Sequence, residues 1–438
     1  MEFIFSKSNK ACAAQLTSKD LRYLLGKIGG ERLAARTEPS VGWAVENRTS
    51  LPRAPVHRRW EKEVTTDMSD QMFTSPSRYV QGIDLLERAA QYVRPLGSTP
   101  LIIADEIVWD IAGARLQESL RGDELRATKE IFGGEASMNE IKRIAEKVEE
   151  AGNDVIIGLG GGKTIDTARA VADHAKLPVA IFPTAVSADA PTARVSVIYT
   201  DEGVFDSYLF YEKNPELVAV DTRVIANAPV RTMRSGIGDA LATCVEARAV
   251  NRANSRRMDD TARPTLAGLA LAEMCEETLF AYAHQALRDN EAHIVSRALE
   301  NICEANTLLS GLGFENGGLA AVHAIHNGFT ALNGDIHHMT HGEKVAFGIA
   351  VQLMLEGADE AEADRYIGFM QSVGLPTTLE EIHLQDASEE DLRRIAELAC
   401  SEGETMKQMP GEITPTDVVE AIKAADLYAR GLQERLAK

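Results

Sequence analysis

The chain has 438 residues, of which 45% are hydrophobic, and a formal net charge of −20. This length predicts two or three domains with sizeable cores. The negative charge disfavours nucleic acid and anionic membranes as partners, and no apolar run is long enough to span a membrane. Five cysteines without a C-x-x-C pair argue against a disulfide framework and favour a reducing, cytoplasmic location.

Residues 1–67 differ from the rest of the chain. They hold 12 Lys and Arg against 8 Asp and Glu, and they lack clear periodicity. Three interpretations compete, namely a disordered extension, a targeting segment, and translated sequence upstream of a start at Met68. A transit peptide should be poor in acidic residues. We therefore interpret residues 1–67 as an extension that is disordered or without function.

From Met68 onward, strand and helix patterns alternate. Four short apolar runs predict buried parallel strands: 98–105, 154–159, 177–184 and 216–222. The segment 139–151 has helical periodicity, with Asn139 as its expected N-cap. Such alternation is typical of an α/β fold with a parallel sheet. We assign residues 68–228 to an α/β dinucleotide-binding domain.

Strand patterns nearly vanish after residue 228. Long helices are predicted instead, at 236–250, 264–288, 291–311, 317–329, 343–356 and 359–373. We therefore assign residues 229–438 to an all-α domain.

Histidines gather in this helical domain. Five of the ten lie between residues 317 and 348: His323, His326, His337, His338 and His341. The i, i+3 spacing of His323 and His326 places both rings on one face of a helix whose other residues are small or apolar. A buried histidine needs a hydrogen-bond partner or a ligand. Because imidazole is the commonest metal ligand, the group predicts part of a metal site, with surface or hydrogen-bonded histidines as the alternative.

A glycine-rich turn follows the predicted strand 154–159 and opens a helix. It reads Gly158-Leu-Gly-Gly-Gly-Lys163-Thr164. Backbone N–H groups at such a turn can approach a phosphate closely. The spacing fits neither a Walker A loop nor G-x-G-x-x-G. We expect a diphosphate site, with a turn that binds no ligand as the alternative.

Three aspartates stand at positions where function and structure compete. Asp105 ends a strand and can accept hydrogen bonds from a ribose diol, which favours NAD over NADP, or it can cap a helix. Asp189 follows a strand where ligands bind in open sheets, or it forms an Asx turn before Pro191. Asp239 lies in an apolar helical segment and needs a partner, either a metal shared with the histidines or a salt bridge.

Longer motifs carry a resemblance. These are GGGKTIDTARA, PT-x-x-S-x-DAP, SVIYTDEG, GIGDALAT, EANTLLSGLGFENGGLAAVHAIHNG, HGEKVAFG and GLPTTL. Over about residues 73–438 the chain resembles the glycerol dehydrogenases of the iron-containing (group III) alcohol dehydrogenase family, which is similar in fold to dehydroquinate synthase. The resemblance implies NAD-dependent oxidation of glycerol to dihydroxyacetone at a cleft between the two domains, and a homo-oligomer such as an octamer.

The resemblance also implies roles for individual residues. The metal ligands would be Asp239, His323 and His341, and the substrate residue would be Asp189; these four would form the catalytic group. The cofactor residues would be Asp105, Gly160, Gly161, Gly162, Lys163, Thr164, Thr184, Ser187, Val195 and Tyr199. His326 would lie behind the ligands or beside the cofactor.

Two departures from the family pattern matter. Iron-dependent relatives carry D-x-x-x-H, but Thr243 stands at the histidine position. The three remaining ligands suit an open tetrahedral Zn²⁺ site. Glycerol-oxidising relatives usually read STDAPCSALSVIY, whereas this chain reads SADAPTARVSVIY. We expect the changes between Ala188 and Val195 to alter the wall beside cofactor and substrate.

Three alternatives remain open. A lyase similar to dehydroquinate synthase would need several basic residues near the metal, and the histidine region offers only Lys344. A non-catalytic protein that binds NAD or zinc is the second alternative, favoured by the changes around Ala188. A dehydrogenase acting on another polyol or on glycerol 1-phosphate is the third.

Overall fold

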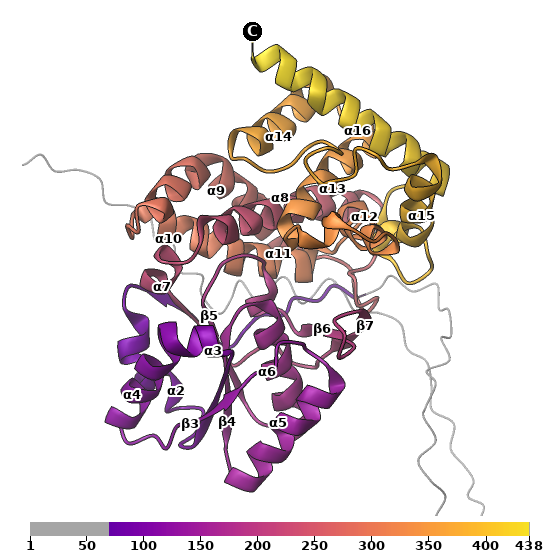
Figure 1. Ribbon diagram of the computed structural model, residues 1–438. Coiled ribbons are helices and arrows are strands. Elements are labelled where there is room, and N and C mark those ends of the chain that lie inside the picture. The colour runs from indigo at the N-terminus through magenta and orange to yellow at the C-terminus, as the bar shows by residue number, and fades with distance from the viewer. Residues whose placement is uncertain (1–69, 438) are drawn as a thin grey trace, which may run out of the picture. The chain divides into compact units, whose positions relative to one another are not determined.

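The computed structural model describes residues 70–437, so the extension predicted at 1–67 lies outside the described residues. The described residues lie in one compact unit. Figure 1 shows the α/β part in indigo and magenta and the helical part in red to yellow. Within residues 70–437, no helix combines the length and the apolar character needed to cross a membrane.

A parallel sheet organises the first part. Its strand order is β1-β8-β5-β4-β2-β3, and all neighbouring pairs are parallel. The bounds are β1 Tyr79–Gly82, β2 Pro100–Ala104, β3 Thr128–Ile131, β4 Val155–Gly160, β5 Val179–Pro183 and β8 Leu217–Asp221. The four predicted strands are β2, β4, β5 and β8, which are buried along their whole length. The edge strands β1 and β3 were not predicted.

Helices cover both faces of this sheet. The bounds are α2 Ala90–Val93, α3 Glu106–Val108, α4 Ala114–Gly122, α5 Met138–Ala151, α6 Gly162–Ala175 and α7 Thr222–Ala226. Because adjacent strand residues point to opposite faces, Ile157 of β4 packs in one hydrophobic cluster with Leu116 of α4. Its neighbour Ile156 packs in another cluster with Ile144 of α5 and Ile165 of α6. The predicted α/β architecture is confirmed.

The predicted cap of α5 was wrong. Ser137 is the N-cap, because its hydroxyl accepts a hydrogen bond from the N–H of Glu140 at 3.2 Å. Asn139 lies inside the first turn of the helix, where its side-chain amide donates to Asp201 at 2.5 Å. Serine serves as well as asparagine at this position, so the choice between the two required the structure.

A short antiparallel hairpin was also missed. It consists of β6 Val195–Tyr199 and β7 Phe205–Phe210. The hydroxyl of Ser196 is buried and donates to the carbonyl of Asp166 in α6 at 3.0 Å. This contact fixes the hairpin beside the helix that follows the glycine-rich turn.

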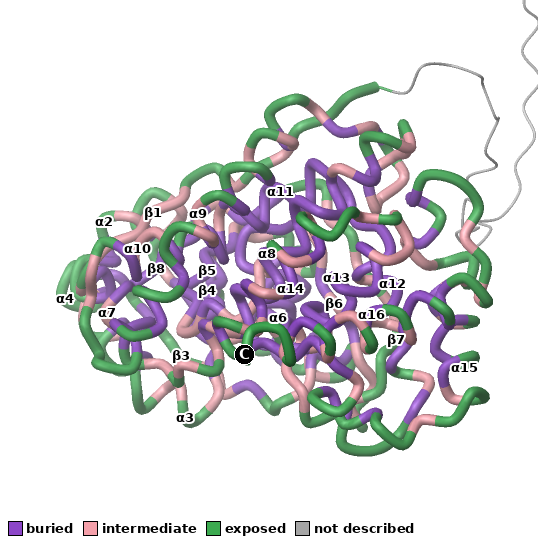
Figure 2. The backbone as a smooth tube through the Cα atoms, turned by 90° about the horizontal axis from the view of Figure 1, so that it is seen from above, coloured by how far each residue is buried: buried purple, intermediate pink, exposed green. Residues whose placement is uncertain are grey.

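Helices make up the described chain after Asp221. The longer ones are α8 Val230–Arg252, α9 Leu266–Glu291, α10 Arg297–Glu304, α11 Ser310–Gly317, α12 Ala321–Gly328, α13 His341–Glu356, α14 Glu360–Ser372, α15 Glu389–Ala399 and α16 Pro415–Leu436. The predicted helical part is confirmed. Figure 2 shows α8 and α11 largely in the colour of buried residues, in line with their many buried side chains.

One predicted helix differs in detail. The segment expected as a helix at 291–311 begins only at Arg297, because His293 adopts a left-handed φ of 57° and ends the preceding helix. A π-helical turn, Ala305–Leu309, then separates α10 from α11. This turn lies next to the candidate site.

Candidate active site

The site is assembled around α8. This helix places Asp239 and Glu246 seven residues apart, which is two turns along the same face. Both carboxylates are buried, with 1% and 0% of their surface exposed. A buried carboxylate must be paired or must bind a metal ion, so this face of α8 requires partners from neighbouring helices.

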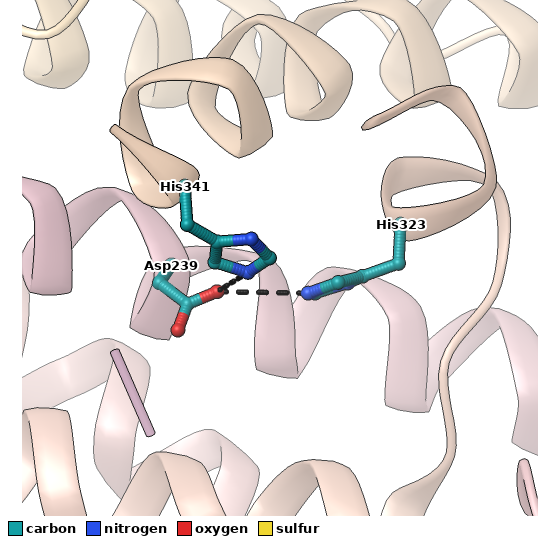
Figure 3. Close-up of side chains that lie close together, drawn as sticks. All are labelled: Asp239, His323 and His341. Carbon is teal, nitrogen blue, oxygen red and sulfur yellow. Dashed lines mark ion pairs between the residues drawn. The ribbon is translucent and has the colours of Figure 1, made fainter. Parts of the chain in front are cut away.

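Two histidines supply partners for Asp239. His323 comes from α12, and His341 is the first residue of α13, which begins with a capping box between Thr340 and Glu343. Asp239 Oδ1 lies 3.0 Å from His341 Nε2 and 3.5 Å from His323 Nε2, and Figure 3 shows both rings turned toward the carboxylate. The structure thus brings the three predicted ligands together.

The donor set suits a divalent metal ion. The ligand atoms of Asp239, His323 and His341 lie within 4.8 Å of one another. Asp239 Oδ1 is buried and has no hydrogen-bond partner in the part of the chain that the structure describes. An unsatisfied buried oxygen facing two imidazole nitrogens fits a cation between them. With three protein ligands, a tetrahedral site keeps one position open.

Glu246 holds His323 in place. Its Oε2 lies 2.6 Å from His323 Nδ1, and its Oε1 accepts the backbone N–H groups of Ala320 at 2.7 Å and His323 at 3.0 Å. The carboxylate engages Nδ1, which leaves Nε2 to face Asp239. A carboxylate behind a ligating histidine fixes its tautomer and orientation. Glu246 was not predicted from the sequence, although its two-turn spacing from Asp239 was a usable signal.

His326 lies behind the other histidine ligand. Its Nε2 is 3.1 Å from His341 Nδ1, and its Nδ1 is 3.1 Å from the side-chain oxygen of Asn327. The i, i+3 pair therefore separates in function, because His323 reaches Asp239 while His326 contacts a ligand instead. This placement agrees with the expected position of His326 behind the ligands.

Charge and burial act together on these groups. Burial disfavours the ionised carboxylate of Asp239, but His341 and His323 outweigh it and hold its pKa far below its usual range. Burial also lowers the pKa of His323, but Glu246 and Asp239 raise it well above its ordinary value. Burial and His341 lower the pKa of His326, which keeps that ring neutral. Asp239 and His323 therefore stabilise each other's charged forms.

Thr243 occupies the position of the histidine found in iron-dependent relatives. Its hydroxyl lies 2.8 Å from the hydroxyl of Ser310 at the start of α11. A Cβ added to Gly313 would approach the Thr243 methyl group to 2.5 Å, so α11 packs closely against this side chain. The position therefore belongs to the contact between α8 and α11.

Asp189 joins the α/β part to this cluster. It follows β5 and precedes a 3₁₀ turn, Ala190–Thr192. Its backbone N–H donates to Asp239 Oδ2 at 3.1 Å, and its Oδ2 accepts a hydrogen bond from Ser310 at 2.8 Å. Burial and the neighbouring Asp239 raise the pKa of Asp189 well above its ordinary value. The predicted substrate residue thus adjoins the predicted metal ligands.

The glycine-rich turn has the form expected of a diphosphate site. β4 ends at Gly160 and α6 begins at Gly162, so free N–H groups of the helix terminus face outward from the sheet edge. A Cβ on Gly160 would approach Thr164 Oγ1 to 2.8 Å, whereas one on Gly161 would meet no atom within 4 Å. Thr184 lies beside the turn, because its N–H donates to the Gly160 carbonyl at 3.1 Å.

Lys163 has a partner within the protein. Its ammonium lies 2.6 Å from Glu135 and 5.1 Å from the centre of the Tyr199 ring. Val195 and Tyr199 belong to β6, where they fall on the half-buried side of the strand. These contacts group Lys163 and Tyr199 beside the turn.

The remaining predicted cofactor residues lie near the same sheet edge. Asp105 caps α3, since its Oδ1 accepts the N–H of Val108 at 2.8 Å. Asp105 therefore caps a helix. The strand that it follows, β2, pairs with β4 and so ends beside the glycine-rich turn. The carbonyl of Ser187 accepts a hydrogen bond from Ser235 at 3.0 Å. No hydrogen bond between described residues joins Asp105 to the turn.

The altered segment between Ala188 and Val195 mostly serves packing. Thr192 donates to the carbonyl of Thr307 at 3.2 Å, and Ala193 is fully buried. Arg194 pairs with Asp259 and, at 3.2 Å, with Glu315. These three side chains are therefore engaged in internal contacts rather than in contacts with the metal cluster.

Comparisons with known proteins agree with this architecture. Residues 76–222 match the model of the family described as iron-containing alcohol dehydrogenase. A glycerol dehydrogenase of Escherichia coli O6:H1 is 47% identical, covering 83% of this chain and 99% of that protein. A glycolaldehyde reductase of Halobacterium salinarum is 44% identical, with 83% and 99% covered. The solved glycerol dehydrogenase of Schizosaccharomyces pombe has a TM-score of 0.82 at 42% identity, with 84% of this chain and 93% of that chain covered.

The chain belongs to the iron-containing alcohol dehydrogenase family. It is an NAD-dependent oxidoreductase that acts on a small molecule and uses a metal cofactor. The expected fold, an α/β part with a parallel sheet followed by a helical part, is the fold of the solved relatives.

Proposed function

We propose that this chain oxidises glycerol to dihydroxyacetone, with NAD⁺ as hydride acceptor and Zn²⁺ as its metal, in a reversible reaction that extends to other vicinal diols. The observation that carries the proposal is the junction of Asp189 and Asp239, whose amide-to-carboxylate distance is 3.1 Å. This contact places Asp189, which is suited to bind a polyol hydroxyl, beside Asp239, which is one of the expected metal ligands. The relatives named glycerol dehydrogenase support the choice of substrate.

Three side chains would hold the zinc ion. These are Asp239, His323 and His341, a set with two nitrogens and one carboxylate that leaves a fourth position open. When bound, Zn²⁺ supplies Lewis-acid chemistry, which makes a substrate hydroxyl easier to deprotonate. Glu246 contributes by keeping His323 Nε2 directed at the cluster.

The sheet edge would hold the dinucleotide. Backbone N–H groups of the turn from Gly160 to Thr164 suit the diphosphate. Asp105 suits the ribose diol, and Thr184, Ser187, Val195 and Tyr199 complete the cofactor contacts. Because β5 leads from this edge to Asp189, the nicotinamide and the substrate would meet beside Asp239.

Asp189 would bind the polyol. Its carboxylate is half-buried, and one of its oxygens already accepts a hydrogen bond from Ser310 at 2.8 Å. The other oxygen is suited to a substrate hydroxyl. A monohydric alcohol has only one hydroxyl. A diol can place one hydroxyl at the metal ion and donate a hydrogen bond from the other to Asp189, so we expect polyols to be the better substrates.

Reduction of a small hydroxyaldehyde is a second candidate for the same site. The relative from Halobacterium salinarum is named glycolaldehyde reductase, and it covers 83% of this chain. The reverse reaction on glycolaldehyde yields a vicinal diol, so it requires the same contacts to Asp189. The substrates are ranked by comparing kcat/KM for the oxidation of glycerol with NAD⁺ and for the reduction of glycolaldehyde with NADH.

The test is NADH formation from glycerol by metal-stripped protein titrated with Zn²⁺. Activity should rise and saturate near one zinc ion per chain. A parallel titration with Fe²⁺ under anaerobic conditions compares the two metals. Stoichiometric zinc binding without oxidation of glycerol, or of any vicinal diol, would reject the proposed reaction while leaving the metal cluster in place.

A further inference from the structure

A π-helical turn lies against the loop that carries Asp189. This π-helical turn, Ala305–Leu309, lies between α10 and α11 and is wider than an α-helical turn. Such turns are rare and shift the register of the helix that follows. Here the side-chain amide of Asn306 donates to the Val186 carbonyl at 3.1 Å, and Thr192 donates to the Thr307 carbonyl at 3.2 Å. The turn thus holds both ends of the loop.

Ser310, the first residue after the turn, reaches Asp189 itself. It is fully buried, and its hydroxyl donates to Asp189 Oδ2 at 2.8 Å. A serine hydroxyl has a single hydrogen to donate. Since Ser310 gives that hydrogen to Asp189, Thr243 must be the donor in the 2.8 Å contact between the two hydroxyls. The result is a directed chain from Thr243 through Ser310 to the carboxylate.

The carboxylate of Asp189 is therefore fixed on one side. Its backbone N–H is bound to Asp239, and its Oδ2 is bound to Ser310. Among the described residues, no hydrogen bond takes up Oδ1. Because rotation of the carboxylate would break the bond to Ser310, Oδ1 keeps one direction relative to Asp239. A fixed acceptor beside a metal ligand can distinguish substrates by the position of a second hydroxyl.

We propose that Ser310, itself held by Thr243, is a positioning residue that orients Asp189 and thereby sets the preference for vicinal diols over monohydric alcohols. This proposal rests on the proposed function. It also explains Thr243. One helical turn after Asp239, the position that carries a histidine in iron-dependent relatives supports the substrate acid in this chain.

The test uses full-length, zinc-loaded variants with 1,2-propanediol and 2-propanol as substrates. Ser310→Ala should raise the KM for the diol about tenfold, because the carboxyl group of Asp189 loses the hydrogen bond that orients it. The kcat/KM for 2-propanol, the KM for NAD⁺ and the zinc content should stay within about twofold of the unmodified enzyme, because the hydroxyl acts only through Asp189.

A second pair of variants tests the chain of hydroxyls. Thr243→Val removes the hydroxyl at nearly constant side-chain shape and should raise the KM for the diol about threefold. Thr243→Ser keeps the hydroxyl, so its KM for the diol should equal that of the unmodified enzyme. Ser196→Ala is the matched control, since Ser196 is equally buried and donates to a backbone carbonyl at 3.0 Å. It should leave the ratio of diol to 2-propanol unchanged.

The outcomes separate the two proposals. Equal losses on 1,2-propanediol and 2-propanol in Ser310→Ala, or the same diol effect in Ser196→Ala, would overturn the positioning role while the proposed function stands. If the enzyme does not oxidise 2-propanol, the KM of Ser310→Ala for the diol is compared with its KM for NAD⁺. Equal increases in both KM values would overturn the positioning role of Ser310. An unmodified enzyme that oxidises no diol would instead refute the proposed function.

Discussion

The cofactor side and the metal side of the site are built from different materials. The turn from Gly160 to Thr164 offers backbone N–H groups at a helix terminus, and its lysine is paired with Glu135 in an exposed position. The metal side consists of side chains from three helices, of which Asp239 is 1% exposed and the His341 side chain is 38% exposed. One side depends on the path of the chain, and the other depends on the identity of each side chain.

This difference sets how the two sides respond to substitution. A backbone site tolerates changes that leave its path and its space intact. A buried network does not, because removal of one member leaves another charge or polar group without a partner. Substitutions on the metal side should therefore produce larger effects than substitutions on the cofactor side.

The largest effect is expected at the histidine ligands. His323→Ala and His341→Ala should each abolish stoichiometric metal binding and lower turnover by about a thousandfold or more, since the Lewis acid is lost. Metal analysis and steady-state rates measure both effects. His338→Ala is the control, because this histidine lies in the same region but is exposed. A metal-free variant with a normal rate would remove the metal from the mechanism.

A smaller loss is expected behind the ligands. Glu246→Gln should weaken metal affinity by about 10- to 100-fold, because the charge that orients His323 is removed. Competition with a chelator measures the dissociation constant. Glu276→Gln provides the comparison, since that carboxylate is also buried but pairs with Arg365 at 3.1 Å. Similar affinities in the two variants would mean that Glu246 serves folding rather than the ligand.

On the cofactor side, space at the glycine turn is the sensitive property. Gly161→Ala meets no protein atom within 4 Å, so it should leave the melting temperature unchanged. A diphosphate that approaches the turn would meet the new methyl group, and the KM for NAD⁺ should rise about tenfold. Gly122→Ala, also without a neighbour within 4 Å, should change neither quantity. An unaltered KM in Gly161→Ala would place the diphosphate elsewhere.

The smallest effect is expected at Asp105. Asp105→Asn retains a good N-cap for α3, so stability should hold while the negative charge is lost. The preference for NAD⁺ over NADP⁺ should narrow by about three- to tenfold, because repulsion of the 2′-phosphate is removed. The ratio of kcat/KM for the two cofactors measures this. A constant ratio would leave Asp105 with its capping role alone.

The accuracy with which secondary structure could be predicted from the sequence also differs between regions. The central strands were predictable because burial on both faces produces continuous apolar runs. The edge strand β3, Thr128–Ile131, reads TKEI and is partly exposed, so it carries no such signal. The hairpin of β6 and β7 was missed because its alternation spans few residues. The α/β and helical parts followed from periodicity alone.

The three predicted ligands lie together in the structure, but Glu246 and the contacts within the site were not predicted. The spacing of His323 and His326 places both on one face, yet only the structure shows that His323 alone reaches Asp239. The contact between Asp189 and Asp239 joins residues 50 positions apart. Ser310 belongs to the motif EANTLLSGLGFENGGLAAVHAIHNG, but its hydrogen bond to Asp189 depends on the π-helical turn before it, which periodicity did not predict.

The tight approach of α8 to the loop after β5 has a consequence for motion. A Cβ on Gly236 would come within 1.8 Å of the Val186 carbonyl, and Ser235 donates to the Ser187 carbonyl at 3.0 Å. The loop is therefore held against α8, although it belongs in sequence to the α/β part. An opening that admits the dinucleotide would then pivot on the sheet side of this loop. The distance between Asp189 and Asp239 would then stay constant during such an opening.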